Sequence, residues 1–209
     1  SIVSYTGTGA NATVGHGLSG APEMMIVRRR TGAGAWYTYH ASNTAAPETD
    51  FLQLQATNAT INSATVWNNT APTSTLFSLG TSSGLNGSGD TYIAYCFHSV
   101  TGYSKFGTYN GTGSANNAVT LGFRPAFLMV KRTNSTEDWF IFDSTRNPLN
   151  TVNLRLKANT TDTDGAYSYV NFTDTGFSWQ ATGTGQNGSG DSYIYMAFAG
   201  GMDSISDYN

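Results

Sequence analysis

Short apolar runs separated by small polar residues recur along the whole chain. The runs are rich in aromatic and β-branched residues, and glycine, asparagine, serine and proline bound them, which is typical of β-strands between turns. No segment keeps an apolar period of 3.6 residues over three turns, so we expect almost no helix. The predicted strands cover residues 2–5, 23–30, 35–40, 51–55, 64–67, 76–79, 91–98, 106–109, 118–121, 127–132, 139–143, 152–156, 167–172, 177–180 and 192–198.

The pattern of the first half of the chain returns in the second half. Ser-Tyr-Thr-Gly-Thr-Gly at 4–9 returns as Thr-Tyr-Asn-Gly-Thr-Gly at 108–113, and Asn-Gly-Ser-Gly-Asp at 86–90 returns at 187–191. Such a repeat predicts two homologous domains, 1–102 and 103–209. The short strands in each fit a two-sheet β-sandwich or jelly roll, so the predicted fold class is all-β. Other matched pairs are Trp36 with Trp139, Phe77 with Phe177, Leu52 with Leu154, and Leu54 with Leu156.

Composition narrows the class of protein further. Of the 209 residues, 11% are charged and 13% are aromatic, and the formal net charge is −3. The aromatic content argues against disorder, and the absence of a basic excess argues against nucleic-acid binding. No apolar stretch has the length of a membrane span, so we expect no membrane insertion. The one cysteine, Cys96, allows no internal disulfide and is expected to be buried.

The repeated motifs resemble a tandem domain of tail-fibre and other structural proteins of tailed bacteriophages, especially marine ones. The resemblance covers nearly the whole chain and rests on residues 5–9, 20–29, 36–42 and 86–97, and on 109–113, 122–132, 139–144 and 187–198. It implies sandwiches similar to those of concanavalin-like lectins and a place in the virion. It brings no catalytic motif with it.

A catalytic constellation is not visible in the sequence. Glycosidases use two carboxyl groups that flank a sugar, and this chain has three glutamates, Glu23, Glu48 and Glu137, which are far apart in sequence. We interpret Glu137 and Asp138 as the tip of a solvated hairpin, because the first half has Gly-Ala-Gly at the corresponding place. No histidine lies near a nucleophile elbow. The protein is therefore expected not to be an enzyme.

The two Asn-Gly-Ser-Gly-Asp segments are candidate calcium sites. Their ligands would be Asn86 and Asp90 in the first half, and Asn187 and Asp191 in the second. One carboxylate in each segment is few for calcium. The alternative is a structural turn in which glycine takes a positive φ and the aspartate caps backbone N–H groups. No other cofactor is expected.

Two tryptophans without a matched partner are candidates for contact with a glycan. Trp67 is followed by Asn68 and Asn69, and Trp179 lies near the end of a predicted strand. Lectins stack tryptophans flanked by amides on sugar rings, but a place in the core is the alternative for both residues.

The sequence thus predicts a non-enzymatic structural protein of the virion, on a tail fibre, tail tip or capsid surface. Its expected partners are other virion proteins, further copies of itself in a homo-oligomer, and a host-surface glycan bound by loops. One alternative is a purely architectural capsid decoration or fibre spacer without a ligand. A polysaccharide depolymerase is a third reading, which the scarcity of clustered carboxylates disfavours.

Overall fold

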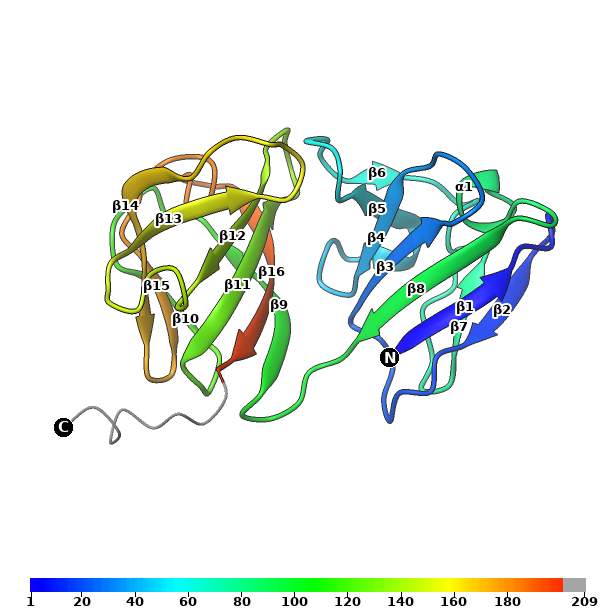
Figure 1. Ribbon diagram of the computed structural model, residues 1–209, viewed down its shortest axis with the longest axis horizontal. Coiled ribbons are helices and arrows are strands. Elements are labelled where there is room, and N and C mark those ends of the chain that lie inside the picture. Colours follow the sequence, from blue (N-terminus) through cyan, green and yellow to red (C-terminus); the bar gives the residue numbers. More distant parts are fainter. Residues whose placement is uncertain (201–209) are drawn as a thin grey trace.

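Antiparallel strands make up almost all of the regular structure of residues 1–200, which are the residues that this computed structural model describes (Figure 1). The first half holds β1 (Ile2–Thr6), β2 (Ala12–Gly15), β3 (Met24–Arg29), β4 (Trp36–His40), β5 (Asp50–Gln53), β6 (Ile61–Asn62), β7 (Leu76–Leu79) and β8 (Thr91–Phe97). The second half holds β9 (Ser104–Asn110), β10 (Asn117–Thr120), β11 (Pro125–Arg132), β12 (Trp139–Asp143), β13 (Val152–Lys157), β14 (Gly165–Thr173), β15 (Gly176–Trp179) and β16 (Ser192–Ala199).

Within the described residues, helix is confined to two short pieces of the first half. These are α1 (Ser83–Asn86) and the 3-10 turn η1 (Pro47–Thr49). Within residues 1–200, no helix is long and apolar enough to cross a membrane. The chain is therefore an all-β protein, as its sequence pattern predicts.

The first half is a sandwich of one large and one small sheet. The large sheet has the strand order β1-β8-β3-β4-β5-β6, and the small sheet pairs β2 with β7. Successive side chains of a strand point to opposite faces. In β3, Met25 and Val27 accordingly join the sandwich core, where they share a cluster with Phe77 and Leu79 of β7.

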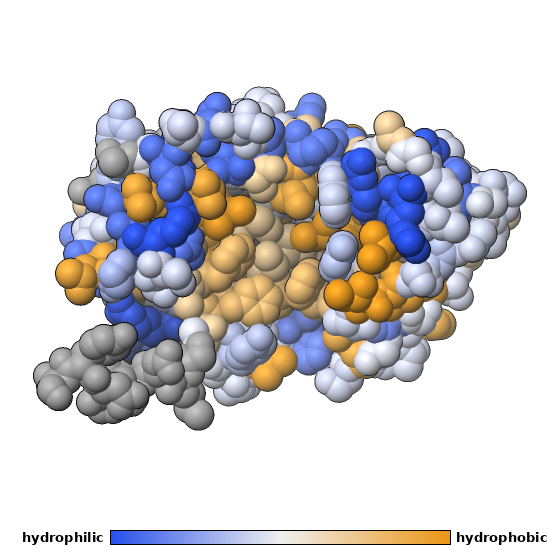
Figure 2. Space-filling view, in the orientation of Figure 1, coloured by the Kyte–Doolittle hydropathy of each residue, from blue (hydrophilic) through white to orange (hydrophobic). Residues whose placement is uncertain are grey.

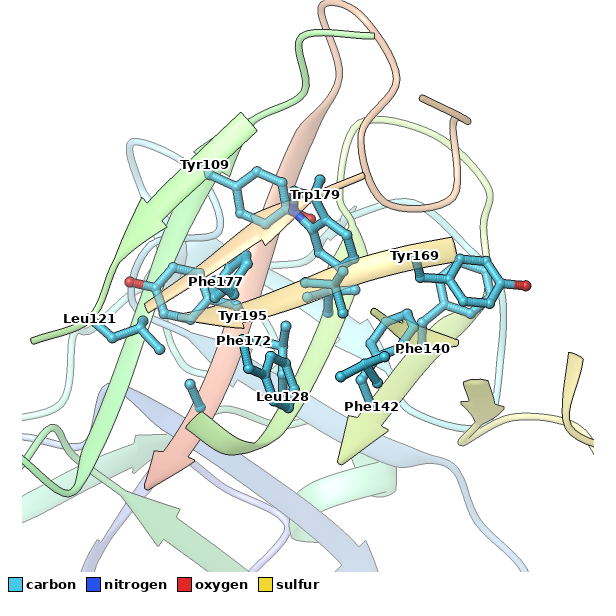
Figure 3. Close-up of a cluster of buried hydrophobic side chains, with 14 of the residues drawn as sticks. Tyr109, Leu121, Leu128, Phe140, Phe142, Tyr169, Phe172, Phe177, Trp179 and Tyr195 are labelled. Atoms are coloured by element: carbon cyan, nitrogen blue, oxygen red, sulfur yellow. The ribbon is translucent and has the colours of Figure 1, made fainter. Parts of the chain in front are cut away.

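The second half is a sandwich made from one folded sheet. Its strand order is β10-β15-β14-β13-β12-β11-β16-β9, and β13 pairs with strands of both layers. Aromatic side chains from the two layers fill the space between them (Figure 3), among them Phe142 of β12, Phe172 of β14 and Trp179 of β15.

A third apolar cluster lies between the two halves. Met24 and Ile26 of β3, on the opposite face from Met25, pack in one cluster with Met129 of β11 and with Ile194 and Met196 of β16. Apolar side chains are visible at this junction in the middle of the face shown in Figure 2. The large sheet of the first half and the β12-β11-β16-β9 layer of the second thus pack against each other through side chains of their outer faces.

Most of the predicted strands occur within one or two residues of their expected bounds. Two short strands, β2 and β6, were not predicted, and the predicted strand at 64–67 is wrong because this segment forms turns and a bend. The ladders run within residues 2–97 and within 104–199, while the end of the predicted second domain, 201–209, lies outside the described residues.

Candidate functional site

The two tryptophans predicted to contact a glycan are buried in the sandwich cores. Trp67 is 1% exposed and donates its indole N–H to the Asp50 carbonyl at 2.9 Å, and Trp179 is 0% exposed. Each packs edge-on against the same repeat position, which lies on β4 in the first half and on β12 in the second: Trp67 against Tyr39 at 5.8 Å and Trp179 against Phe142 at 5.6 Å. The two halves therefore fill one core position with tryptophans from different segments. Stacking on a sugar is the wrong interpretation for both, because neither ring face reaches solvent.

Asn68 and Asn69 form the turn that follows Trp67. Both take positive φ, 55° and 47°, a conformation that asparagine tolerates better than most residues. Their presence is explained by the backbone, and the ring that they were expected to flank at a sugar site points into the core. The prediction of a glycan site at these four residues is therefore not supported.

Asn86 and Asn187 hold distant segments together. Each is 0% exposed and satisfies its whole side-chain amide: the Asn86 oxygen accepts from the Thr8 N–H at 2.8 Å, and its nitrogen donates to the carbonyls of Ala10 and Gly80. Asn187 repeats the pattern with Thr112, Ser114 and Ala181. An amide oxygen that faces backbone N–H groups is not oriented toward a cation.

The two aspartates of these segments form ion pairs with arginine. Asp90 lies 3.2 Å from Arg29, and Asp191 lies 2.6 Å from Arg132. No group of three or more metal-binding side chains occurs among the described residues. The arrangement therefore does not support the calcium hypothesis for Asn86, Asp90, Asn187 and Asp191, since these oxygens already face hydrogen-bond donors and guanidinium groups.

The two repeated glycine motifs of each half interlock. Gly7 donates to the Asp90 carbonyl and accepts from the Gly89 N–H. A Cβ at Gly7 would stand 2.2 Å from the Gly87 carbonyl oxygen, and one at Gly111 would stand 2.0 Å from that of Gly188. Both positions therefore require glycine, and the motifs that recur in the sequence serve the architecture of each sandwich.

A solvent-open concavity of about 620 Å³ in the second half is the best candidate for a functional site. It lies over the edge of the sandwich where β12, β13 and β14 meet the loop before β16. The lining residues are Glu137, Asp138, Phe140, Arg155, Lys157, Tyr167, Tyr169, Ala181, Gly183, Thr184, Gly185 and Gln186.

Arg155 is the central cation of this concavity. Its guanidinium carbon lies 4.1 Å from the ring centre of Phe140 and 4.7 Å from that of Tyr169, which are cation–π distances. Phe140 and Tyr169 stand together at one end of the core cluster, with the Tyr169 hydroxyl directed away from it (Figure 3). That hydroxyl is buried and has no hydrogen-bond partner among the described residues. The two rings thus fix the guanidinium in one orientation.

Strand register shows what stands at this position in the first half. Trp36 begins β4 and Trp139 begins β12, so Thr38 and Ile141 are equivalent positions two residues further along. Thr38 pairs with Leu52 across the sheet, and Ile141 pairs with Leu156. Leu52 therefore corresponds to Leu156, so the predicted matches of Leu52 with Leu154 and of Leu54 with Leu156 are wrong by two residues. One position earlier in each strand, Phe51 corresponds to Arg155. Phe51 is buried and packs on Tyr37 at 5.1 Å.

The acidic residues of the wall differ in their partners. Asp138 pairs with Lys157 at 2.9 Å and accepts from the Asn159 amide at 2.7 Å. Partial burial works against the charged form, but these two partners lower the pKa of Asp138 below its usual value. Glu137 accepts from the Asp138 N–H at 3.1 Å, and its own N–H donates to Thr57 of the first half. The prediction of a solvated hairpin tip is thus wrong, since both residues line the concavity and Glu137 also contacts the other half.

Two further lining residues complete the wall. Tyr167 is 70% exposed and packs edge-on against Tyr169 at 5.7 Å. Lys157 pairs with Asp162 as well as with Asp138, and its hydrogen bonds to these two carboxylates raise its pKa. Arg155 and Tyr167 were not predicted from the sequence. A correct repeat alignment would have shown Arg155 as a charged residue at a strand position that is apolar in the first half.

The fold and the site define an all-β protein of two tandem sandwiches, the second of which carries the open concavity. A family model described as "Domain of unknown function (DUF7483)" matches residues 1–201, and the chain belongs to this family. The comparisons with curated proteins and with solved structures found no match.

Proposed function

We propose that the chain is a non-enzymatic carbohydrate-binding module whose glycan site is the concavity of the second sandwich. The observation that carries this proposal is the exposed Tyr167 ring beside a guanidinium fixed by Phe140 and Tyr169. Small-ligand sites combine aromatic walls with a few well-placed polar groups. A tyrosine ring offers a sugar an apolar face, while Arg155 and Gln186 offer donors to its oxygen atoms.

The chemistry of the wall favours binding over hydrolysis. A glycosidase needs a proton-donating carboxyl group and a second carboxylate across the sugar. Glu137 and Asp138 are neighbours in the chain, and the lowered pKa of Asp138 keeps it ionised and paired with Lys157. Two ionised carboxylates side by side suit hydrogen bonding to sugar hydroxyl groups, but they do not supply the protonated carboxyl group that glycoside hydrolysis needs. A polysaccharide depolymerase is therefore the weaker proposal.

The place of this module in a virion remains part of the proposal. The resemblance of the repeated motifs to those of phage structural proteins favours a tail fibre, tail tip or capsid surface, where other virion proteins and further copies of the chain would surround it. Many copies on one particle would raise the avidity of a weak site. The first sandwich, with Phe51 where the second has Arg155, would then serve as a spacer that supports the binding half.

A glycan array probed with the whole chain on multivalent beads tests the proposal. We expect the wild type to bind a subset of glycans and Tyr167→Ala to lose that binding. Tyr103→Ala is the matched control, because Tyr103 is also an exposed tyrosine but lies in the linker between the halves, outside the concavity.

Two outcomes would overturn the assignment. Absence of binding at high bead density would favour the architectural alternative, and binding that survives Tyr167→Ala would move the site elsewhere. Release of reducing ends from a bound polysaccharide would favour the depolymerase over a binding module.

Mass spectrometry of purified particles would test the placement in the virion, and the absence of the chain from them would contradict it.

A further inference from the structure

We infer that the ligand of the concavity carries an acidic group, a carboxylate or a sulfate ester on a sugar, and that Arg155 binds it. This inference rests on the proposed function, because it names the chemistry of the glycan in the same site. Among the cations of the wall, Arg155 is the one for which the described part of the protein offers no carboxylate partner.

The guanidinium of Arg155 is held in one orientation, but its N–H groups have no acceptor in the described side chains. Phe140 and Tyr169 hold it at 4.1 and 4.7 Å. Among the residues whose side chains the structure describes, which exclude Ala166 and Ser168, none forms a salt bridge with it or accepts a hydrogen bond from it. The neighbouring cation, Lys157, has two carboxylates, Asp138 and Asp162. A planar guanidinium donates two parallel hydrogen bonds to a carboxylate or sulfate, and its fixed orientation lowers the entropy lost on binding.

Comparison with the first half shows that the fold does not need a charge here. At the same strand position, Phe51 closes the end of the sandwich by packing on Tyr37. A charge at a half-buried position is unfavourable unless it is paired. Because an apolar ring meets the structural demand in one half, the cation in the other half indicates a ligand with the opposite charge.

The acidic residues of the wall limit the charge of that ligand. Asp138 is compensated by Lys157, so the carboxylate of Glu137 is the acceptor that remains for ligand hydroxyl or amide groups. Asp162 also lies near, through its pair with Lys157. A sugar with a single acidic group would satisfy Arg155, whereas a densely sulfated chain would be repelled by these carboxylates.

The test compares saccharides that differ only in one acidic group. Biolayer interferometry would use immobilised neutral oligosaccharides, the same oligosaccharides with one uronic or sialic acid, and the same with one sulfate ester. The wild type is expected to bind at least one acidic series about tenfold more tightly than the neutral series, as a charge-assisted hydrogen bond provides. Whichever acidic series binds identifies the anion.

Two variants separate charge from folding. Arg155→Gln keeps a polar side chain with an N–H donor and is expected to lose about tenfold in affinity for the acidic ligand. Its loss for neutral ligands is expected to be smaller, so the preference for the acidic over the neutral series should fall. Arg155→Phe installs the side chain that the first half has, and should show the same loss with an intact thermal transition. Lys105→Gln, on β9 and outside the concavity, is the control for general loss of positive charge.

The outcomes distinguish this inference from the proposed function. Equal binding of neutral and acidic sugars, or acidic binding unchanged by Arg155→Gln, would overturn the inference and leave the glycan site standing. Failure to bind any saccharide would overturn both. Tightest binding to a densely sulfated polymer, with equal losses in Lys105→Gln and Arg155→Gln, would also overturn it, because that pattern indicates non-specific charge attraction.

Discussion

Arg155 stands in the second sandwich at the strand position where Phe51 stands in the first. The strand register establishes this correspondence. Thr38 pairs with Leu52, its equivalent Ile141 pairs with Leu156, and Phe51 and Arg155 each come one residue earlier. Phe51 packs on Tyr37 and is buried, whereas the Arg155 guanidinium lies on Phe140 at the margin of an open concavity. One exchange between the two copies thus accompanies the difference between a closed and an open end of the sandwich.

The first prediction follows from this exchange. Arg155→Phe should raise the stability of the protein, because an apolar ring in contact with Phe140 and Tyr169 removes the cost of holding a charge beside the core. We expect a gain of about 1 kcal/mol, which corresponds to an increase in Tm of about 2–4 °C for a chain of this size. Differential scanning calorimetry measures it.

The control for this prediction is Arg30→Phe, at an exposed position after β3, which should leave Tm unchanged or slightly lower. A decrease in Tm for Arg155→Phe would show that the two cation–π contacts contribute more to stability than the apolar ring that replaces them. It would mean that the arginine is kept at this position for stability.

The second prediction concerns the buried asparagines. Asn187→Ala removes hydrogen bonds to Thr112, Ser114 and Ala181 and leaves partly buried backbone groups without a partner. Each unpaired buried group costs about 1–3 kcal/mol. We expect a loss of about 3 kcal/mol and a decrease in Tm of about 6–12 °C. Asn86→Ala should behave alike, and Asn11→Ala, at an exposed position, should change Tm by less than about 1 °C.

The third prediction separates a structural turn from a calcium site. Because the Asp90 and Asp191 carboxylates pair with Arg29 and Arg132, neither calcium nor a chelator should shift the thermal transition. Arg132→Gln should instead lower Tm, since it leaves Asp191 without its cation. A calcium-dependent increase in Tm that Asp191→Asn abolishes would contradict this arrangement.

The strands were predictable from sequence because their alternation and their bounding turns are local properties. The repeat also predicted two matching sandwiches, and the matched residues Phe77 and Phe177 accordingly occupy equivalent positions in two separate cores. The segment 64–67 failed because Val66 and Trp67 are buried in a turn, and apolar residues in a short run do not distinguish a turn from a strand.

The site was less predictable than the fold. Tryptophan in a polar context suggested a sugar platform, but burial is decided by packing partners such as Tyr39 and Phe142, which lie far away in the sequence. Arg155 was missed because two leucines on each strand allow two alignments, and the one that was chosen conceals its correspondence to Phe51. Strand register, which depends on tertiary pairing, is what separates them.

His40 joins the two halves and provides the last prediction. Its Nδ1 accepts from the Ser42 N–H at 3.1 Å, so the proton lies on Nε2 and is donated to the Tyr195 carbonyl of β16 at 3.1 Å. Burial lowers the pKa of His40 to about 4, although the hydrogen bond to Tyr195 works in the opposite direction. In the folded protein the ring is therefore neutral at pH 6.

The stability of the protein should accordingly fall as the pH drops from about 6.5 to 4. The unfolded chain takes up a proton on His40 near pH 6.5 and the folded chain only near pH 4, so protons favour the unfolded state throughout this window. Below pH 4 both states are protonated and the loss is complete, at about 3 kcal/mol. Urea unfolding at several pH values measures it. The difference in unfolding free energy between wild type and His40→Gln should shrink by that amount from pH 7 to pH 4.

Ser42→Ala is the control, because it adds or removes no titrating group. It should shift the plot of unfolding free energy against pH without changing its shape. A difference between wild type and His40→Gln that is constant with pH would show that His40 titrates alike in both states, and its burial between β4 and β16 would then have no effect on stability in acid.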